Sequence, residues 1–253
     1  MLISGKKGML TDRDNAILLD LYFTRILSTK QIALLYFETE ATAKRRLYDL
    51  ANIKGVIEPL TPKTGLTVWT LTKPAFWRAA EFVYPDDRYR GFPEIRYIPH
   101  MLDANDIYVG VRKDLDSVLG ENPAWQWIDE ARMMLEQGAK SKALPSVKKK
   151  KQPDAELAFE GNRYFIERQT HRSRKTKQEL DEKVDGYRRY FSRMGESEGA
   201  REVIFATDVQ RDRENVLESA EKHDIDLSAG TVEEVSDYLI EQAKEAAAVR
   251  ASQ

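Results

Sequence analysis

The stretch that decides the fold is PDAELAFEGNRYFIERQ, residues 153–169. The dipeptide Gly161-Asn162 stands between two runs of alternating apolar and polar residues, the pattern of two strands joined by a two-residue turn. This turn places Glu160 opposite Arg163. The expected pairs farther from the turn are Leu157 with Ile166, Glu156 with Glu167, and Asp154 with Gln169.

Alternation along the strands gives the predicted hairpin two different faces. One face is apolar and holds Leu157, Phe159, Tyr164 and Ile166. The other face is polar and holds Asp154, Glu156, Glu167 and Gln169. Like charges that oppose one another destabilise a sheet, so stability alone does not favour the polar face. A divalent cation such as Mg²⁺ would neutralise it, since this ion takes carboxylate ligands.

The composition describes a globular chain without cysteine chemistry. Of the 253 residues, 42% are hydrophobic and the formal net charge is -2. The absence of cysteine excludes disulfides, thiolate zinc sites and cysteine nucleophiles, and three widely spaced histidines argue against a histidine-built metal site. No apolar run has membrane-spanning length and the N-terminus lacks a signal peptide, so we expect a cytoplasmic protein with no membrane contact.

The small net charge hides an uneven distribution. Residues 1–80 carry a net charge of +5, and residues 139–151 hold six lysines, ending in Lys148, Lys149, Lys150 and Lys151. Residues 212–245 hold eleven acids against three bases. Basic segments separated from an acidic one indicate a face for a polyanion. A solvated loop accounts for the four-lysine run equally well.

The first 80 residues predict three short helices followed by a β-hairpin. The helices begin near Thr11, at Ser28 or Thr29, and near Thr42. The third is expected to run to Ile53 and to end at Gly55 in a left-handed C-cap. Its inward residues are Leu47, Leu50 and, as a further candidate, Ile53. The hairpin strands are residues 56–60 and 66–71.

This order of elements is that of a winged helix-turn-helix, whose third helix lies in the DNA major groove. The outer face of the third helix carries Lys44, Arg45 and Arg46, and Lys63 lies at the tip of the hairpin. We therefore expect these residues to contact double-stranded DNA. Two alternatives stay open: winged helices also bind proteins, and three bases on one helix can form an ordinary wet surface.

A proline-rich connector separates this region from the rest of the chain. We expect a winged helix-turn-helix domain over 1–80, a connector over 81–98, and a second domain over 99–253. Further elements are expected as a helix over 100–119, a strand over 125–133, a helix over 176–193, a strand over 201–208, and helices over 213–223 and 231–249. A capping box of Thr231 and Glu234 opens the last helix.

The order α-β-β-β-α-β, with Pro153-Asp154 and Glu167-x-Gln169, resembles the PD-(D/E)XK nuclease-like superfamily. The fold class implied is α+β, a winged helix-turn-helix followed by an α/β domain of this type. The resemblance implies that Asp154 and Glu167 bind Mg²⁺ or Mn²⁺. Gln169 stands where the superfamily has its lysine, and a neutral amide supplies no positive charge.

The helix after the hairpin offers a substitute lysine. Some members of the superfamily carry this lysine, or a Gln-x-x-x-Tyr motif, on that helix, and Lys183-x-x-x-Tyr187 has this spacing. The alternative is that Lys183 pairs with Glu179 or reaches solvent while Tyr187 packs in the core. An upstream glutamate is also common in the superfamily, and Glu130 is the candidate here.

The chain as a whole resembles the replication-relaxation family of plasmid and mobile-element proteins over residues 10–210. The resemblance rests on QIALLYF (31–37), RRLYDL (45–50), Pro99-His100, Lys150-x-x-Pro153-Asp154, and Lys183-x-x-x-Tyr187-x-x-Tyr190. It implies a role in plasmid DNA replication, relaxation or conjugation rather than a defined reaction.

Three functions follow as hypotheses. The first is a DNA-binding replication accessory whose second domain adds a basic surface through Lys148–Lys151, Arg172, Arg174 and Lys175. Its expected partners are double-stranded DNA, plasmid replication or relaxase proteins, and a second copy of the chain in a homodimer. The second is a Mg²⁺- or Mn²⁺-dependent endonuclease using Asp154, Glu167, Gln169 and Lys183, so enzymatic activity stays open. The third is a transcriptional regulator.

Overall fold

The computed structural model describes residues 10–61, 66–83, 95, 97–120, 125–129, 153–170, 176–194 and 201–252. The chain is mixed α+β and divides into two compact units, Met1–Asn105 (unit 1) and Asp106–Gln253 (unit 2). Several residues singled out in the sequence lie outside the described ranges, namely Lys63, Glu130, Lys148 to Lys151, Arg172, Arg174 and Lys175.

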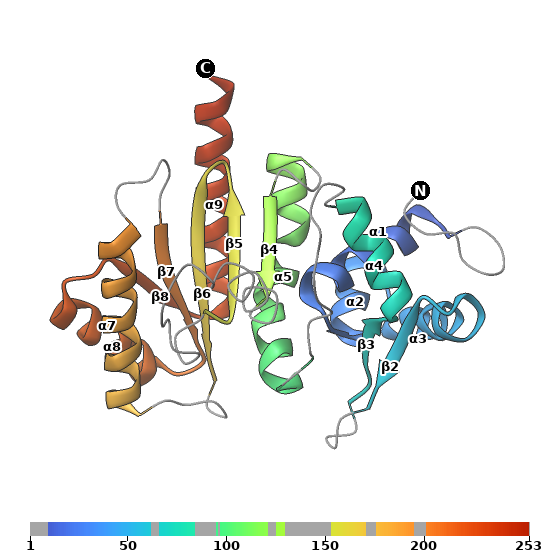
Figure 1. The fold of residues 1–253 in the computed structure, drawn as a ribbon, viewed down its shortest axis with the longest axis horizontal. Coiled ribbons are helices and arrows are strands. Elements are labelled where there is room, and N and C mark those ends of the chain that lie inside the picture. The colour runs from blue at the N-terminus through green and yellow to red at the C-terminus, as the bar shows by residue number, and fades with distance from the viewer. Residues whose placement is uncertain are drawn as a thin grey trace. The chain divides into compact units, whose positions relative to one another are not determined.

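Unit 1 contains the expected three helices followed by a hairpin (Figure 1). Its elements are α1 (Asp12–Thr24), β1 (Leu27–Ser28), α2 (Thr29–Tyr36), α3 (Glu40–Asp49), the π-helical turn η1 (Leu50–Lys54), β2 (Ile57–Leu60), β3 (Val68–Leu71) and α4 (Lys73–Val83). The sequence did not predict β1, which pairs antiparallel with β3 and gives a three-stranded sheet of order β1-β3-β2.

Local sequence sets the helix ends of unit 1. Thr11 and Asp14 form a capping box at α1, and Ser28 and Gln31 form another at α2. Backbone amides at the N-termini of both helices are therefore satisfied. Gly55 has φ 64° and ends η1 in the predicted left-handed C-cap. The prediction for Ile53 is wrong, because this side chain is 50% exposed on the π-helical turn.

Unit 2 is built around a five-stranded sheet of order β4-β5-β6-β7-β8. Strands β4 (Trp125–Asp129), β5 (Ala155–Phe159) and β6 (Asn162–Gln169) pair antiparallel, whereas β7 (Arg201–Thr207) and β8 (Leu227–Gly230) continue the sheet in parallel. The helices are α5 (Ile98–Leu119), which begins in unit 1, α7 (Lys177–Met194), α8 (Gln210–His223) and α9 (Val232–Ala251). The predicted order α-β-β-β-α-β is confirmed, and β8 was not predicted.

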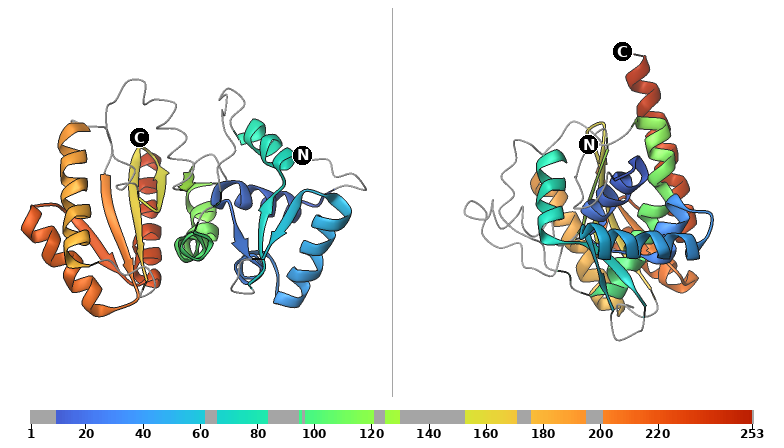
Figure 2. Two further views of the ribbon diagram at one scale, coloured as in Figure 1. Left: turned by 60° about the horizontal axis from the view of Figure 1, so that its bottom comes forward. Right: turned by 90° about the vertical axis from the view of Figure 1, so that its right-hand side faces the viewer.

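Helices cover both faces of this sheet (Figure 2). On one face, α7 and α8 pack over β6, β7 and β8 through Phe165, Val184, Phe205, Val216 and Leu227. On the other face, Tyr108 of α5 contacts the buried Trp125 and Trp127, and Tyr238 of α9 reaches Glu202. None of the described helices is long and apolar enough to cross a membrane.

The hairpin exists, but its turn lies one residue earlier than predicted. Glu160 and Gly161 form the turn with φ of 47° and 80°, and Phe159 pairs with Asn162. Both φ values are positive, as a type I′ turn requires. The predicted pairs are therefore wrong by two residues, so that Glu156 opposes Phe165 and not Glu167. A two-residue shift preserves which side chains share a face, because the period of a strand is two.

Candidate functional site

The polar face of the hairpin lies under α7, and Glu167 is its most enclosed carboxylate. The residue on β6 is 1% exposed, and α7 engages both of its oxygens. Lys183 Nζ donates to Oε2, and the Tyr187 hydroxyl donates to Oε1 at 2.5 Å. The two donors are four residues apart on α7, so they lie on one side of the helix. Lys183 thus reaches the carboxylate face, and Glu179 instead bonds to Thr176.

Burial fixes the protonation state of Tyr187. Burial, reinforced by the negative charge of Glu167 and then of Asp154, raises the pKa of Tyr187 well above its ordinary value. The hydroxyl therefore keeps its proton at neutral pH and acts as a donor. The ring also packs in the core beside Phe165 and Phe191, so Tyr187 both fills space and satisfies a carboxylate.

Asp154 and Gln169 complete the group on this face. Asp154 precedes β5 and its Oδ2 accepts a hydrogen bond of 2.7 Å from the backbone amide of Arg168. Gln169, two residues after Glu167, is 2% exposed, and its Oε1 has no hydrogen-bond partner among the residues that the structure describes. We call Asp154, Glu167, Gln169, Lys183 and Tyr187 the carboxylate centre.

Glu156 lies on the same face but is neutralised separately. Arg163 Nε donates to its Oε1 at 2.6 Å across the hairpin, and the Arg163 guanidinium also lies 5.8 Å from the centre of the Phe165 ring. Sequence reasoning missed this pair because the wrong register placed Arg163 opposite Glu160. The acidic face is therefore divided between an ion pair near the turn and the carboxylate centre farther along the strands.

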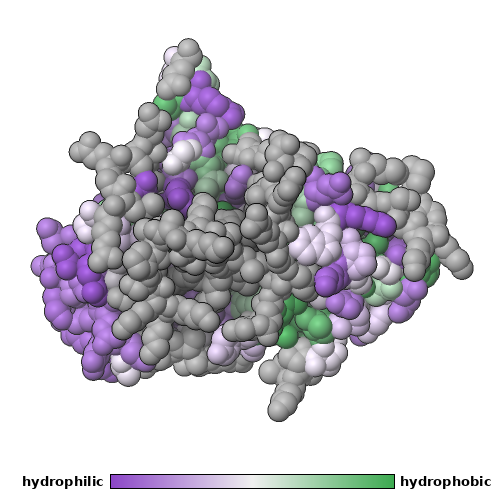
Figure 3. Space-filling view, viewed as in Figure 1, coloured by the Kyte–Doolittle hydropathy of each residue, from purple (hydrophilic) through white to green (hydrophobic). Residues whose placement is uncertain are grey.

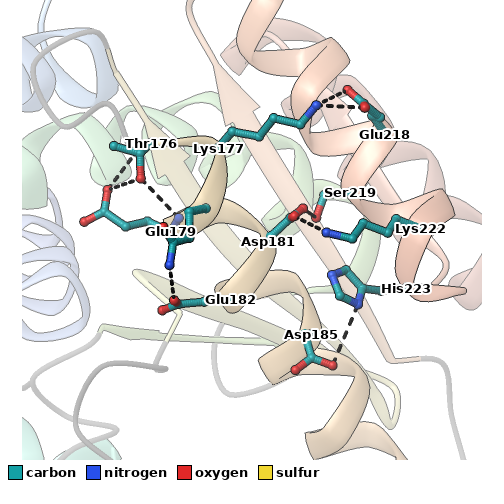
Figure 4. Close-up of polar contacts among 11 residues, drawn as sticks. Thr176, Lys177, Glu179, Asp181, Glu182, Asp185, Glu218, Ser219, Lys222 and His223 are labelled. Carbon is teal, nitrogen blue, oxygen red and sulfur yellow. Dashed lines mark hydrogen bonds and ion pairs between the residues drawn. The ribbon is translucent and has the colours of Figure 1, made fainter.

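Contacts with α8 fix the position of α7 (Figure 4). Lys177 pairs with Glu218 at 2.8 Å, and Asp181 accepts hydrogen bonds from Ser219, at 2.6 Å, and from Lys222. Farther along, Asp185 lies 3.8 Å from His223. The outer surface of α7 and α8 is accordingly hydrophilic, as the left side of Figure 3 shows. These contacts hold Lys183 and Tyr187 over β6.

The residues of the carboxylate centre suit a hard cation. Two carboxylates and an amide oxygen are ligands that Mg²⁺ and Mn²⁺ accept, with water or phosphate completing the coordination. Gln169 Oε1 is a buried acceptor to which no described residue donates a hydrogen bond. Within the described ranges no group of three or more His, Cys, Asp or Glu residues is placed to hold a metal. A metal ion at the carboxylate centre would therefore have two carboxylate ligands, Asp154 and Glu167, from the described residues.

A second polar surface lies on α3 in unit 1. Ala41, Lys44, Arg45 and Tyr48 are all exposed, and their spacing puts them on one side of the helix. No ion pair or hydrogen bond joins the Lys44 or Arg45 side chain to another described residue. Tyr48 packs edge-on against Trp69 of β3, with ring centres 5.3 Å apart, so the sheet supports this helix face. We call these four residues the α3 face.

Arg46 differs from its two neighbours on α3. Its guanidinium binds Asp14, with Nε at 2.8 Å from Oδ1, and its side chain is only 25% exposed. Asp14 is fully buried and also caps α1. Burial alone would raise the pKa of Asp14, but hydrogen bonds from Arg46 and Thr11 outweigh it and lower the pKa. Arg46 therefore joins α3 to α1, a role that the sequence did not reveal.

The two units define a mixed α+β protein with a basic helix face in unit 1 and a carboxylate centre in unit 2. Residues 18–207 match the model of the replication-relaxation family, and the chain belongs to this family. Membership supports a role in plasmid or mobile-element replication or relaxation. Comparison with curated proteins gives no match, and neither does comparison with solved structures.

Proposed function

We propose that this protein binds double-stranded DNA in plasmid or mobile-element replication or relaxation. In this proposal unit 1 is a winged helix-turn-helix that places α3 in the major groove. The observation that carries it is the α3 face, where Lys44 and Arg45 are exposed and have no acidic partner among the described residues. Two uncompensated cations beside an exposed aromatic ring suit contacts to phosphates and base edges.

Replacing Lys44 and Arg45 together with glutamine is expected to weaken duplex binding by about ten- to a hundredfold, because two phosphate contacts are lost. The plot of log affinity against log salt concentration should become less steep, and the magnitude of its negative slope should decrease by about two, for the same reason. Fluorescence anisotropy with a labelled duplex over a salt series measures both quantities. The matched control is the double change Lys73→Gln and Arg78→Gln on α4, two exposed residues of the same unit. Equal losses in both variants would contradict the assignment of α3.

A second candidate function is metal-dependent DNA cleavage at the carboxylate centre. The gathering of Asp154, Glu167, Gln169 and Lys183 on one face favours it, since the superfamily resemblance assigns the reaction to these positions. Asp154 and Glu167 would hold Mg²⁺ or Mn²⁺, which would supply charge stabilisation at the phosphate. Gln169 could orient a water molecule, and Lys183 could face the phosphate.

If the second candidate is right, wild-type protein with Mn²⁺ should nick supercoiled plasmid and Asp154→Asn should not. Asp154 suits this test because it lies at the margin of the centre and the change to asparagine keeps its shape. Agarose gel electrophoresis measures the cleavage, and fluorescence anisotropy on the same preparations measures DNA binding. Retained DNA binding without cleavage by either protein would leave binding as the function and exclude cleavage.

A further inference from the structure

Glu167 receives its counter-charge from within the protein. Lys183 holds one oxygen and Tyr187 the other, and the side chains of Glu167 and Lys183 are 1% and 10% exposed. A buried carboxylate without a partner would be strongly unfavourable. The ammonium of Lys183 therefore supplies the charge compensation that a divalent cation at Glu167 would otherwise supply.

A metal ion and the Lys183 ammonium would compete for the same carboxylate. Both are positive, and both would lie within a few ångströms of the Glu167 oxygens. Their repulsion is weakly screened because water scarcely reaches either side chain. Glu167 therefore binds a metal less tightly while the ammonium is in place, and metal binding favours an ammonium that has moved away.

The movement would have to come from the side chain, since contacts to α8 hold α7. The pairs Lys177–Glu218 and Asp181–Ser219 precede Lys183 on the helix and connect it to α8. A lysine has a flexible four-carbon stem, so its ammonium can swing away while the helix stays in place. Gln169 Oε1, which accepts no hydrogen bond from the described part of the chain, would then join the two carboxylates as a ligand.

We propose that Lys183 is an internal counter-ion of the carboxylate centre, which competes with a divalent cation for Glu167 and keeps metal affinity low. This inference goes beyond DNA binding by the α3 face and does not depend on it. It also means that Lys183 weakens metal binding, whereas a residue that recruits the metal would strengthen it.

The test compares Mn²⁺ binding by wild-type protein and Lys183→Met in isothermal titration calorimetry. Methionine keeps much of the aliphatic stem and removes the charge. We expect Lys183→Met to bind Mn²⁺ at least about tenfold more tightly, because the competing cation is gone. Adding Asp154→Asn to this variant should abolish the gain. Lys244→Met, which removes a 54% exposed lysine from α9 of the same unit, should bind as the wild type does.

Equal or weaker Mn²⁺ binding by folded Lys183→Met overturns the proposal. If Lys183→Met does not fold, the proposal is tested on the wild-type protein. NMR then follows the signals of the lysine ammonium groups during a Mg²⁺ titration. Displacement of the hydrogen-bonded Lys183 signal supports the proposal. A Lys183 signal that stays unchanged while the backbone amide signals of Asp154 and Glu167 show that Mg²⁺ has bound overturns it. DNA affinity measured on the same samples tests the proposed function separately.

Discussion

Replacing Arg46 with methionine is expected to lower the free energy of unfolding by about 3 kcal/mol, because it leaves a buried carboxylate without its partner. Asp14 is fully buried, whereas Arg46 is 25% exposed, which places the loss at the lower end for buried pairs. Urea denaturation at neutral pH measures the change. The matched control is Arg45→Met at the preceding position of α3. Arg45 is exposed, so this change should lower the free energy of unfolding by less than about 0.5 kcal/mol.

The loss should depend on pH in a defined direction. The folded state lowers the pKa of Asp14, so the stability from its ion pair is fully present above the ordinary carboxyl pKa of about 4. That stability is lost as the pH falls through the lowered value. The gap between wild type and Arg46→Met should therefore narrow in acid. A gap that stays constant with pH would mean that Arg46 stabilises the fold through packing alone.

The expected loss of stability in Arg46→Met also affects how DNA binding is tested. Combining Arg46 with Arg45 in one variant would mix a folding defect with a binding defect. The pair Lys44 and Arg45 avoids this problem, since neither is tied to another described residue. A loss of DNA binding in Arg46→Met could arise from the lost connection to α1 as well as from a lost DNA contact, so its unfolding curve must accompany any binding curve.

Replacing Glu167 with alanine is expected to cost about 3–5 kcal/mol, because Lys183 and Tyr187 then lose a shared buried acceptor. Denaturant unfolding measures the change. The double variant Glu167→Ala, Lys183→Met should recover part of the loss, since the unpaired ammonium is also removed. If the double variant is as unstable as the sum of the two single changes, the pair contributes little to stability.

The cost at Glu167 limits what a cleavage assay with Glu167→Ala can show. Loss of nicking in this variant would follow from unfolding as readily as from loss of a metal ligand. Asp154 is less enclosed, and its carboxylate accepts a backbone hydrogen bond from Arg168 at 2.7 Å, so Asp154→Asn separates the two effects better. A comparison that includes both variants with their unfolding curves distinguishes a catalytic defect from a structural one.

Local sequence determined much of this protein. Thr11, Ser28 and Thr231 cap helices through bonds to residues three positions away, and Gly55 ends η1 in the left-handed conformation. The two faces of the hairpin were likewise predictable, because alternation survives a two-residue error in register. These features depend on neighbours in the chain, which a sequence displays directly.

Tertiary structure alone decided which charges meet. Arg46 and Asp14 are thirty-two positions apart, so the sequence did not indicate their pair. For Lys183 the sequence left two positions open, near the carboxylates or beside Glu179, and only the packing of α7 on β6 placed it on Glu167. The short strands β1 and β8 also escaped prediction, since each is stabilised by a partner strand rather than by its own pattern. The sequence by itself thus determined the elements and their polar faces. Packing decided which cations neutralise the buried carboxylates, because a charge removed from water takes the partner that the fold brings within reach.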